Sequence, residues 1–186
     1  MLLLYTVINE CAGNYFHYCL HRPNFFLYNI YVPIEFGFYS LQIVLVLKAN
    51  SRKRLILTSL LTGLLFSVWN IAFGKGLNNG YNTDTNILLS LLLIFASLVY
   101  LYDLLTYSEH IETPIREPMF WIVAGLLFFN FGCLIINALY DYAEAKHLTL
   151  FGKEIYSQIM KLLNLLMYSC FTISFVLCYR TRKSIC

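Results

Sequence analysis

The sequence predicts an all-α, polytopic membrane protein built as a bundle of six transmembrane helices. Of its 186 residues, 59% are hydrophobic and only 12% are charged, whereas a soluble domain carries about 25% charged residues. The apolar residues also fall in blocks of about 20, the length that a helix needs to cross a bilayer. Only helices and closed barrels can span lipid, and runs this long without strict alternation indicate helices.

Apolar runs place the six candidate spans at residues 1–20, 25–47, 55–73, 86–106, 118–140 and 155–179. The first span ends before Pro23, and the second ends before a basic run at 51–54. A loop with three glycines at 74–80 separates the third span from the fourth. Pro118 opens the fifth span, since proline is well tolerated in the first turn of a helix, and a basic run at 180–183 closes the sixth. No loop is long enough for a soluble domain, so residues 1–186 are predicted to form a single transmembrane domain.

The distribution of Lys and Arg among the loops predicts the orientation, because cytoplasmic loops are enriched in both. One side carries eight of them: Lys48, Arg52, Lys53, Arg54, Arg116, Arg180, Arg182 and Lys183. The other side carries four: Arg22, Lys75, Lys146 and Lys153. We therefore expect both termini in the cytoplasm. The sequence has no N-x-[ST] glycosylation sequon, which agrees with a bacterial inner (plasma) membrane.

Two carboxylates and one amine lie within the predicted spans. Glu10 and Glu35 fall near the middle of the first and second spans, where a charge costs at least about 2.5 kcal/mol and marks a functional site. Lys161 lies about six residues, or about 9 Å, inside the outer end of the sixth span, and its stem adds several ångströms of reach. We expect Lys161 to pair with one carboxylate and the other carboxylate to be protonated.

Polar residues recur every three or four positions in several spans, so they share one face of each helix. The first span carries Thr6, Glu10, Asn14, His17 and His21. The second carries Asn24, Tyr28, Tyr31, Glu35, Tyr39 and Gln42, and the sixth carries Ser157, Lys161, Asn164, Tyr168 and Thr172. A small-residue stripe in the third consists of Ser59, Gly63, Ser67 and Asn70. Such stripes should point into the bundle.

Two interpretations of these stripes remain open. They hold helices together through close packing and hydrogen bonds, or they line a polar cavity between the first, second and sixth spans. In the second case the candidate ligand, ion or proton site consists of Glu10, Asn14, His17, Tyr31, Glu35, Lys161 and Asn164. Asp103, near the inner end of the fourth span, is instead expected to reach headgroup water.

Signatures of catalysis, metal binding and nucleic-acid binding are missing from the sequence. There is no HExxH, GxSxG or P-loop motif, so we lean toward a protein that is not an enzyme. His17, Cys19 and His21 are close together, but no further cluster completes a metal site; we predict no metal and no cofactor. The six cysteines form no CxxC pair, and the basic residues form no aromatic-laced patch for nucleic acid.

Two runs carry a resemblance to a wider group of proteins: YNIYVPIEF at 28–36 and PMFWIVAG at 118–125. They resemble patterns in multi-pass bacterial membrane proteins that are similar to the membrane input regions of sensor kinases. The group has no agreed activity, and its members often have helices ahead of the segment that begins this chain. The resemblance implies that Tyr31, Glu35, Phe120 and Trp121 matter.

These observations predict a non-enzymatic sensing or interaction module with a buried ionisable site. It would act through a partner membrane protein or a homo-oligomer within the lipid bilayer. One alternative is a small transporter or channel subunit whose pathway uses the same polar core. Others are a membrane accessory of a bacterial defence or secretion system and an intramembrane enzyme using Glu35 or His17.

Overall fold

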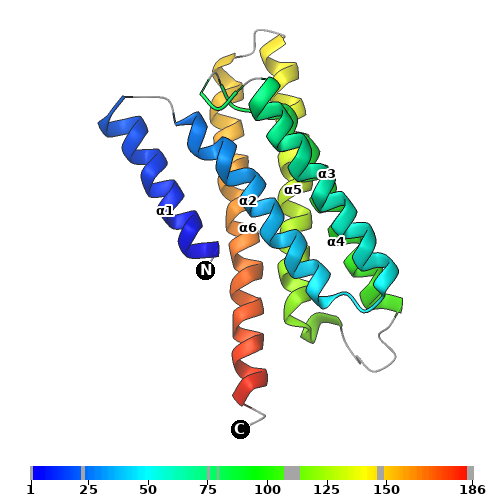
Figure 1. Ribbon diagram of the computed structural model, residues 1–186. Helices are drawn as coiled ribbons and strands as arrows, with labels where there is room; N and C mark the ends of the chain where they lie inside the picture. The colour runs from blue at the N-terminus through cyan, green and yellow to red at the C-terminus, as the bar shows by residue number, and fades with distance from the viewer. Residues whose placement is uncertain are drawn as a thin grey trace. The chain divides into compact units, whose positions relative to one another are not determined.

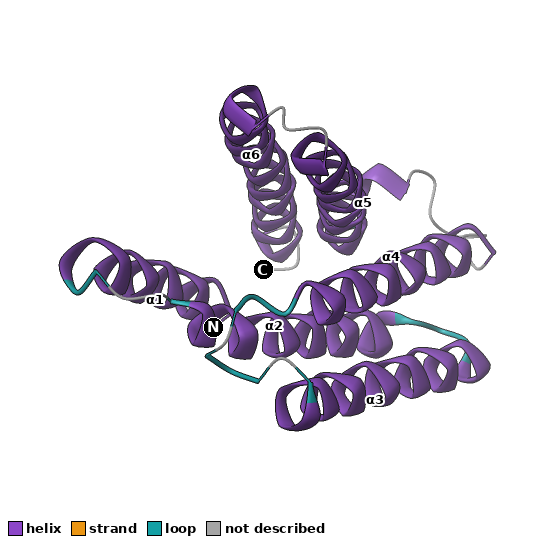
Figure 2. Ribbon diagram, turned by 90° about the horizontal axis from the view of Figure 1, so that it is seen from above, coloured by secondary structure: helices purple, strands orange, loops and turns teal. Residues whose placement is uncertain are grey.

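The computed structural model describes residues 2–21, 24–74, 76–78, 80–106, 114–145 and 149–183, which contain helices and loops but no strand (Figure 2). The elements in chain order are α1 (Leu2–Asn14), the π-helical turn η1 (Tyr15–Cys19), α2 (Phe25–Val46), α3 (Asn50–Phe73), α4 (Thr83–Thr106), the 3₁₀ turn η2 (Pro114–Arg116), α5 (Pro118–Ala145) and α6 (Thr149–Lys183).

Five of these helices contain segments long and apolar enough to cross a membrane: Phe25–Val46, Asn50–Phe73, Thr83–Thr106, Pro118–Ala138 and Tyr156–Arg180. The chain is therefore an all-helical, multi-pass membrane protein, as predicted from its hydrophobic blocks. The α5 and α6 helices extend beyond their predicted spans, since polar and charged residues at a span's end do not by themselves stop a helix.

The predicted first span, 1–20, is not among these five. Its α-helix has 13 residues, a length of about 20 Å against a hydrocarbon core of about 30 Å. At Tyr15 the hydrogen-bonding pattern widens into the π-helical turn η1. Asn9, Glu10 and Asn14 also interrupt the apolar run. The fold thus shows five candidate membrane-spanning helices, and a bundle of six is not confirmed.

The chain divides into two compact units, which are described separately. The first consists of Met1–Val46 and Asn50–Leu92, and the second of Leu47–Ala49 and Leu93–Cys186. In the first unit α1 lies beside α2, and α2 lies beside α3 (Figure 1).

Gly63 is the point of closest packing between α2, α3 and the start of α4 in the first unit. A Cβ atom at this position would lie 2.8 Å from the Phe36 ring and 2.9 Å from Leu89, so a larger residue would push the helices apart. One turn later, the Ser67 hydroxyl donates to the Gly63 carbonyl at 2.8 Å. The small-residue stripe predicted for the third span therefore serves helix packing.

The second unit is centred on α5 and α6, two consecutive helices that run side by side in opposite directions (Figures 1 and 2). Gly125 and Gly132 of α5 allow this approach, because a Cβ atom would lie 2.9 Å from Cys170 at the first and 2.5 Å from Leu163 at the second. Near the end of the pair, the Tyr156 hydroxyl donates to Asn137 Oδ1 at 3.0 Å.

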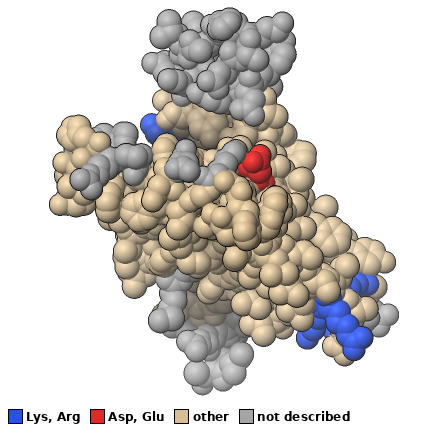
Figure 3. Space-filling model, turned by 45° about the horizontal axis from the view of Figure 1, so that its top comes forward, with Lys and Arg blue, Asp and Glu red and all other residues tan. Residues whose placement is uncertain are grey.

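Much of the surface is apolar, as expected for helices in lipid. Figure 3 shows a face on which charged side chains are few: most of the Lys and Arg atoms lie in one small patch, others lie apart from it, and one group of Asp and Glu atoms is visible. On α3 a single exposed stripe consists of Leu57, Leu61, Leu65 and Val68. A contiguous apolar stripe of this kind would promote aggregation in water, and it suits contact with acyl chains.

Candidate ionisable site between α1 and α2

Side-chain hydrogen bonds join α1 to α2 along one seam. The Thr6 and Tyr31 hydroxyls lie 2.9 Å apart, and the Tyr28 hydroxyl donates to Glu10 Oε2 at 3.3 Å. Farther along, Asn24 Nδ2 donates to the Gly13 carbonyl at 3.2 Å. As the residue number rises along α1, the number of its partner on α2 falls. The two helices are therefore antiparallel.

This seam is formed by two of the polar stripes predicted from the sequence. Thr6 and Glu10 belong to the stripe of the first span, and Asn24, Tyr28 and Tyr31 belong to that of the second. Their spacing of three or four residues keeps each set on one face of its helix. The two polar faces therefore meet, as expected if such side chains avoid lipid.

Glu35 continues the seam one turn beyond Tyr31 on α2. Its side chain is half-buried, and it is hydrogen-bonded to Tyr31 and interacts electrostatically with Glu10. Tyr31, which is only 8% exposed, thus links the Thr6 hydroxyl to the Glu35 carboxyl. Glu10 is itself exposed at the edge of the seam. Two carboxyl and three hydroxyl groups are gathered along this contact.

Aromatic rings and one glycine complete the contact. Tyr5 stacks on Tyr31 with ring centroids 5.7 Å apart, and Phe16 meets Phe26 edge to face at 5.3 Å. Gly13 allows the close approach, since a Cβ atom there would lie 3.1 Å from the Tyr28 hydroxyl. Gly13 was not among the predicted site residues, although its position between Glu10 and Asn14 was a usable signal.

Among the four remaining predicted site residues, Asn14 belongs to the same unit and makes none of the hydrogen bonds of this seam. Asn14 is exposed where α1 passes into η1, and the side chain of His17 lies outside the described residues. Lys161 and Asn164 belong to the second unit. There Lys161 is exposed, and Asn164 Nδ2 donates to the Met160 carbonyl of its own helix at 3.0 Å. The pairing of Lys161 with a carboxylate stays a prediction.

Asn29 fixes the loop between α3 and α4, a role that was not predicted from the sequence. Its Nδ2 donates to the carbonyls of Leu77 at 3.0 Å and Gly80 at 2.9 Å, and its Oδ1 accepts from the Asn82 N–H at 3.0 Å. The Asn29 side chain makes these three hydrogen bonds and is only 4% exposed. The bonds hold the loop in place where regular secondary structure does not. The sequence signal for this role was an asparagine that lies inside an apolar span but does not belong to the polar stripe of that span.

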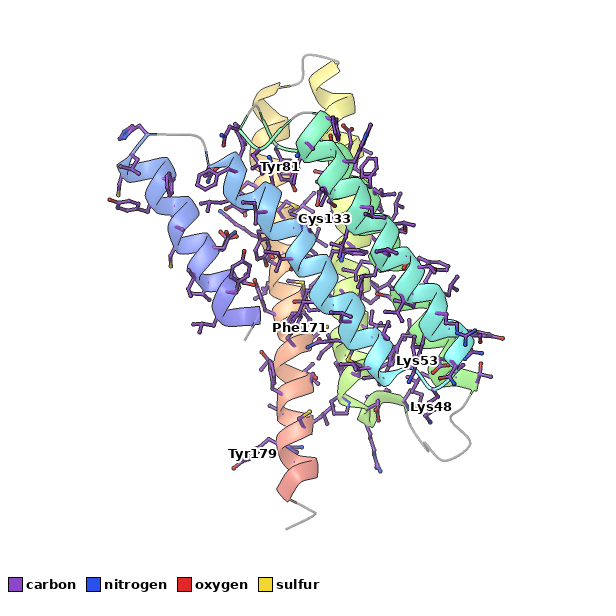
Figure 4. All side chains as sticks on the ribbon, viewed as in Figure 1. Lys48, Lys53, Tyr81, Cys133, Phe171 and Tyr179 are labelled. Carbon is purple, nitrogen blue, oxygen red and sulfur yellow. The ribbon has the colours of Figure 1, made fainter. Side chains whose placement is uncertain are left out.

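Asp103 differs from its expected role as a boundary acid in headgroup water. It is only 3% exposed, and its Oδ2 accepts from the backbone N–H of Lys48 at 2.8 Å. Lys48 lies just after the end of α2 (Figure 4). Because peptide groups beyond a helix end need partners from outside the helix, Asp103 acts as a buried anchor for this turn.

The fold and the seam define a multi-pass α-helical membrane protein with an ionisable contact between two of its helices. No protein-family model matches the sequence, and no significant similarity was found to a curated protein or a solved structure. Among the residues whose structure is described, no three His, Cys, Asp or Glu side chains gather closely enough to hold a metal ion.

Proposed function

We propose that this protein is a non-enzymatic sensing or interaction module of a bacterial inner membrane, with both termini in the cytoplasm and the α1 segment as a sixth membrane segment. The observation that carries the proposal is the ionisable seam, above all the Tyr28–Glu10 hydrogen bond. Ionisable side chains at membrane depth are costly, and by default they indicate a functional site. The run 28–36, which resembles patterns in multi-pass bacterial membrane proteins, falls on the same part of α2.

In this proposal the seam is the element that changes state. Helix α1 is held to α2 largely by polar and aromatic side chains, whereas Leu4, Val7 and Ile8 of α1 are more than half exposed. A ligand or proton that alters Glu10 or Glu35 would change the strength of the α1–α2 contact. The loops are short, so such a change would pass to a partner membrane protein or a second copy through contacts within the bilayer.

The proposal is tested by the thermal stability of the purified protein in detergent at pH values from about 4 to 8. A carboxyl group whose protonation is coupled to the fold makes Tm depend on pH. We expect Glu35→Gln to remove part of that dependence. Asp84→Asn, at the exposed start of α4, is the matched control: it removes a carboxylate outside the seam and should keep the part of the pH dependence that Glu35→Gln removes. Identical profiles for wild type and Glu35→Gln would refute a titrating site at Glu35.

A small transporter or channel subunit is the second candidate, favoured by the continuous chain from Thr6 through Tyr31 to Glu35. Hydroxyl and carboxyl groups in such a chain can pass protons or coordinate ions. Proteoliposomes loaded with a pH-sensitive dye distinguish the two functions. Proton flux that is lost in Glu35→Gln and kept in Asp84→Asn would favour transport over sensing.

A further inference from the structure

A narrow crevice lies in the first unit between the N-terminal half of α2 and the start of α4. Tyr28, Asn29, Val32 and Pro33 line it from α2, and Tyr81, Asn82, Thr85 and Asn86 line it from the opposite side. Figure 4 marks Tyr81 at this end of α4. The volume of the crevice is about 10 Å³, which is close to the smallest space that holds one water molecule.

One oxygen atom on the lining residues lacks a hydrogen-bond donor, and a second lacks its usual donor within the helix. Asn82 is 3% exposed, and its buried Oδ1 has no hydrogen-bond partner among the residues that the structure describes. Its other side-chain atom, Nδ2, already donates to the Gly76 carbonyl at 3.3 Å, so exchanging the two amide atoms would lose that bond. On the facing wall, Pro33 has no N–H to donate to the Asn29 carbonyl four residues earlier in α2.

We propose that one buried water molecule occupies this crevice and donates its two hydrogens to Asn82 Oδ1 and to the Asn29 carbonyl. The Asn86 amide also lines the crevice and can donate to the water oxygen, which would give three hydrogen bonds, the usual number for a buried water. None of the eight lining residues is a carboxylate. A metal cation would lose its hydration there without a counter-charge, so water is favoured.

The water would connect three features that the chain places far apart. It would satisfy the carbonyl freed by Pro33 within α2, and it would tie that helix to the start of α4. It would also lie beside Tyr28, which lines the crevice and donates to Glu10. The inference rests on the crevice and its unpaired oxygen, and it holds whether or not the seam is a sensing site.

The experiment is an X-ray or cryo-EM structure of the full chain at better than about 2 Å, with a second data set from crystals soaked in thallium. We expect a density peak within about 3.2 Å of Asn82 Oδ1 and no thallium signal at that point. If the residues that line the crevice are well ordered and no density peak is present, the proposal is overturned. An anomalous thallium peak would show that a monovalent cation occupies the site instead of water.

A pair of variants tests the same assignment by displacement. Val32→Ile adds a methyl group at the wall of the crevice, and the density peak should disappear. Leu61→Ile, on the exposed face of α3, adds no atom near the crevice and should keep the peak. A peak at full height in Val32→Ile, with the new methyl group inside the crevice, would contradict a water at this position.

Discussion

Tyr28 donates its phenolic hydrogen to Glu10 across the α1–α2 contact, with 3.3 Å between Oη and Oε2. The bond joins two antiparallel helices whose polar faces meet. Because Glu10 is exposed, this bond stabilises the contact modestly, and its loss should loosen α1 without unfolding the protein.

Tyr28→Phe should therefore increase the mobility of α1 while leaving the rest of the first unit intact. The phenyl ring keeps its packing, and only a hydrogen bond worth about 0.5–1.5 kcal/mol is lost. Hydrogen exchange of the α1 amides, measured in detergent or nanodiscs, should speed up by about two- to twelve-fold. Tyr15→Phe removes an exposed hydroxyl from η1 and should leave exchange unchanged. Equal exchange rates in the two variants would show that the Tyr28–Glu10 bond contributes nothing to holding α1.

Gly63→Ala should destabilise the protein, whereas Gly37→Ala should not. The new methyl group at Gly63 would meet the Phe36 ring at 2.8 Å and Leu89 at 2.9 Å, and such overpacking costs about 1–3 kcal/mol. At Gly37, inside α2, nothing lies within 4 Å of the added atom, and alanine is favoured over glycine in a helix by about 1 kcal/mol. Thermal unfolding of both variants provides the measurement. A Gly63→Ala protein as stable as wild type would mean that α2, α3 and α4 pack less closely than described.

Asn29→Ala should strongly destabilise the loop that joins α3 to α4. It removes three hydrogen bonds, to Leu77, Gly80 and Asn82, and leaves their backbone groups unpaired, at about 1–3 kcal/mol for each group that stays buried. Limited proteolysis within 74–82 should become faster, and Tm should fall. Asn78→Ala, at an exposed position of the same loop, serves as the control. If both variants are cleaved at the wild-type rate, the loop does not depend on Asn29.

The hydrophobic spans and the polar seam were predictable, because both depend on local periodicity. Length and apolar content are sufficient to recognise α2 to α6, and a spacing of three or four residues places Tyr28, Tyr31 and Glu35 on one face. Interactions over long sequence separations were not predictable. The carbonyls bound by Asn29 lie 48 and 51 residues away, and Asp103 reaches a peptide 55 residues away. Nothing in the pattern of either segment identifies such a partner. The break at Asn14 was missed because α-helical and π-helical turns have the same apolar composition.

The predicted pairing of Lys161 with one of the two carboxylates can be tested at Glu35 by a double-mutant cycle. A lysine and a glutamate in contact within an apolar environment should couple by more than about 0.5 kcal/mol, whereas distant residues should be additive. The variants Lys161→Met, Glu35→Gln and their combination are compared by thermal unfolding in the same detergent. If the two residues pair, either single variant leaves a charge unmatched, and the double variant recovers part of the lost stability. Glu117→Gln combined with Lys161→Met gives the additive reference. Strict additivity for Lys161 and Glu35 as well would exclude the pair. Lys161 would then pair with Glu10, or its stem would extend toward the membrane surface.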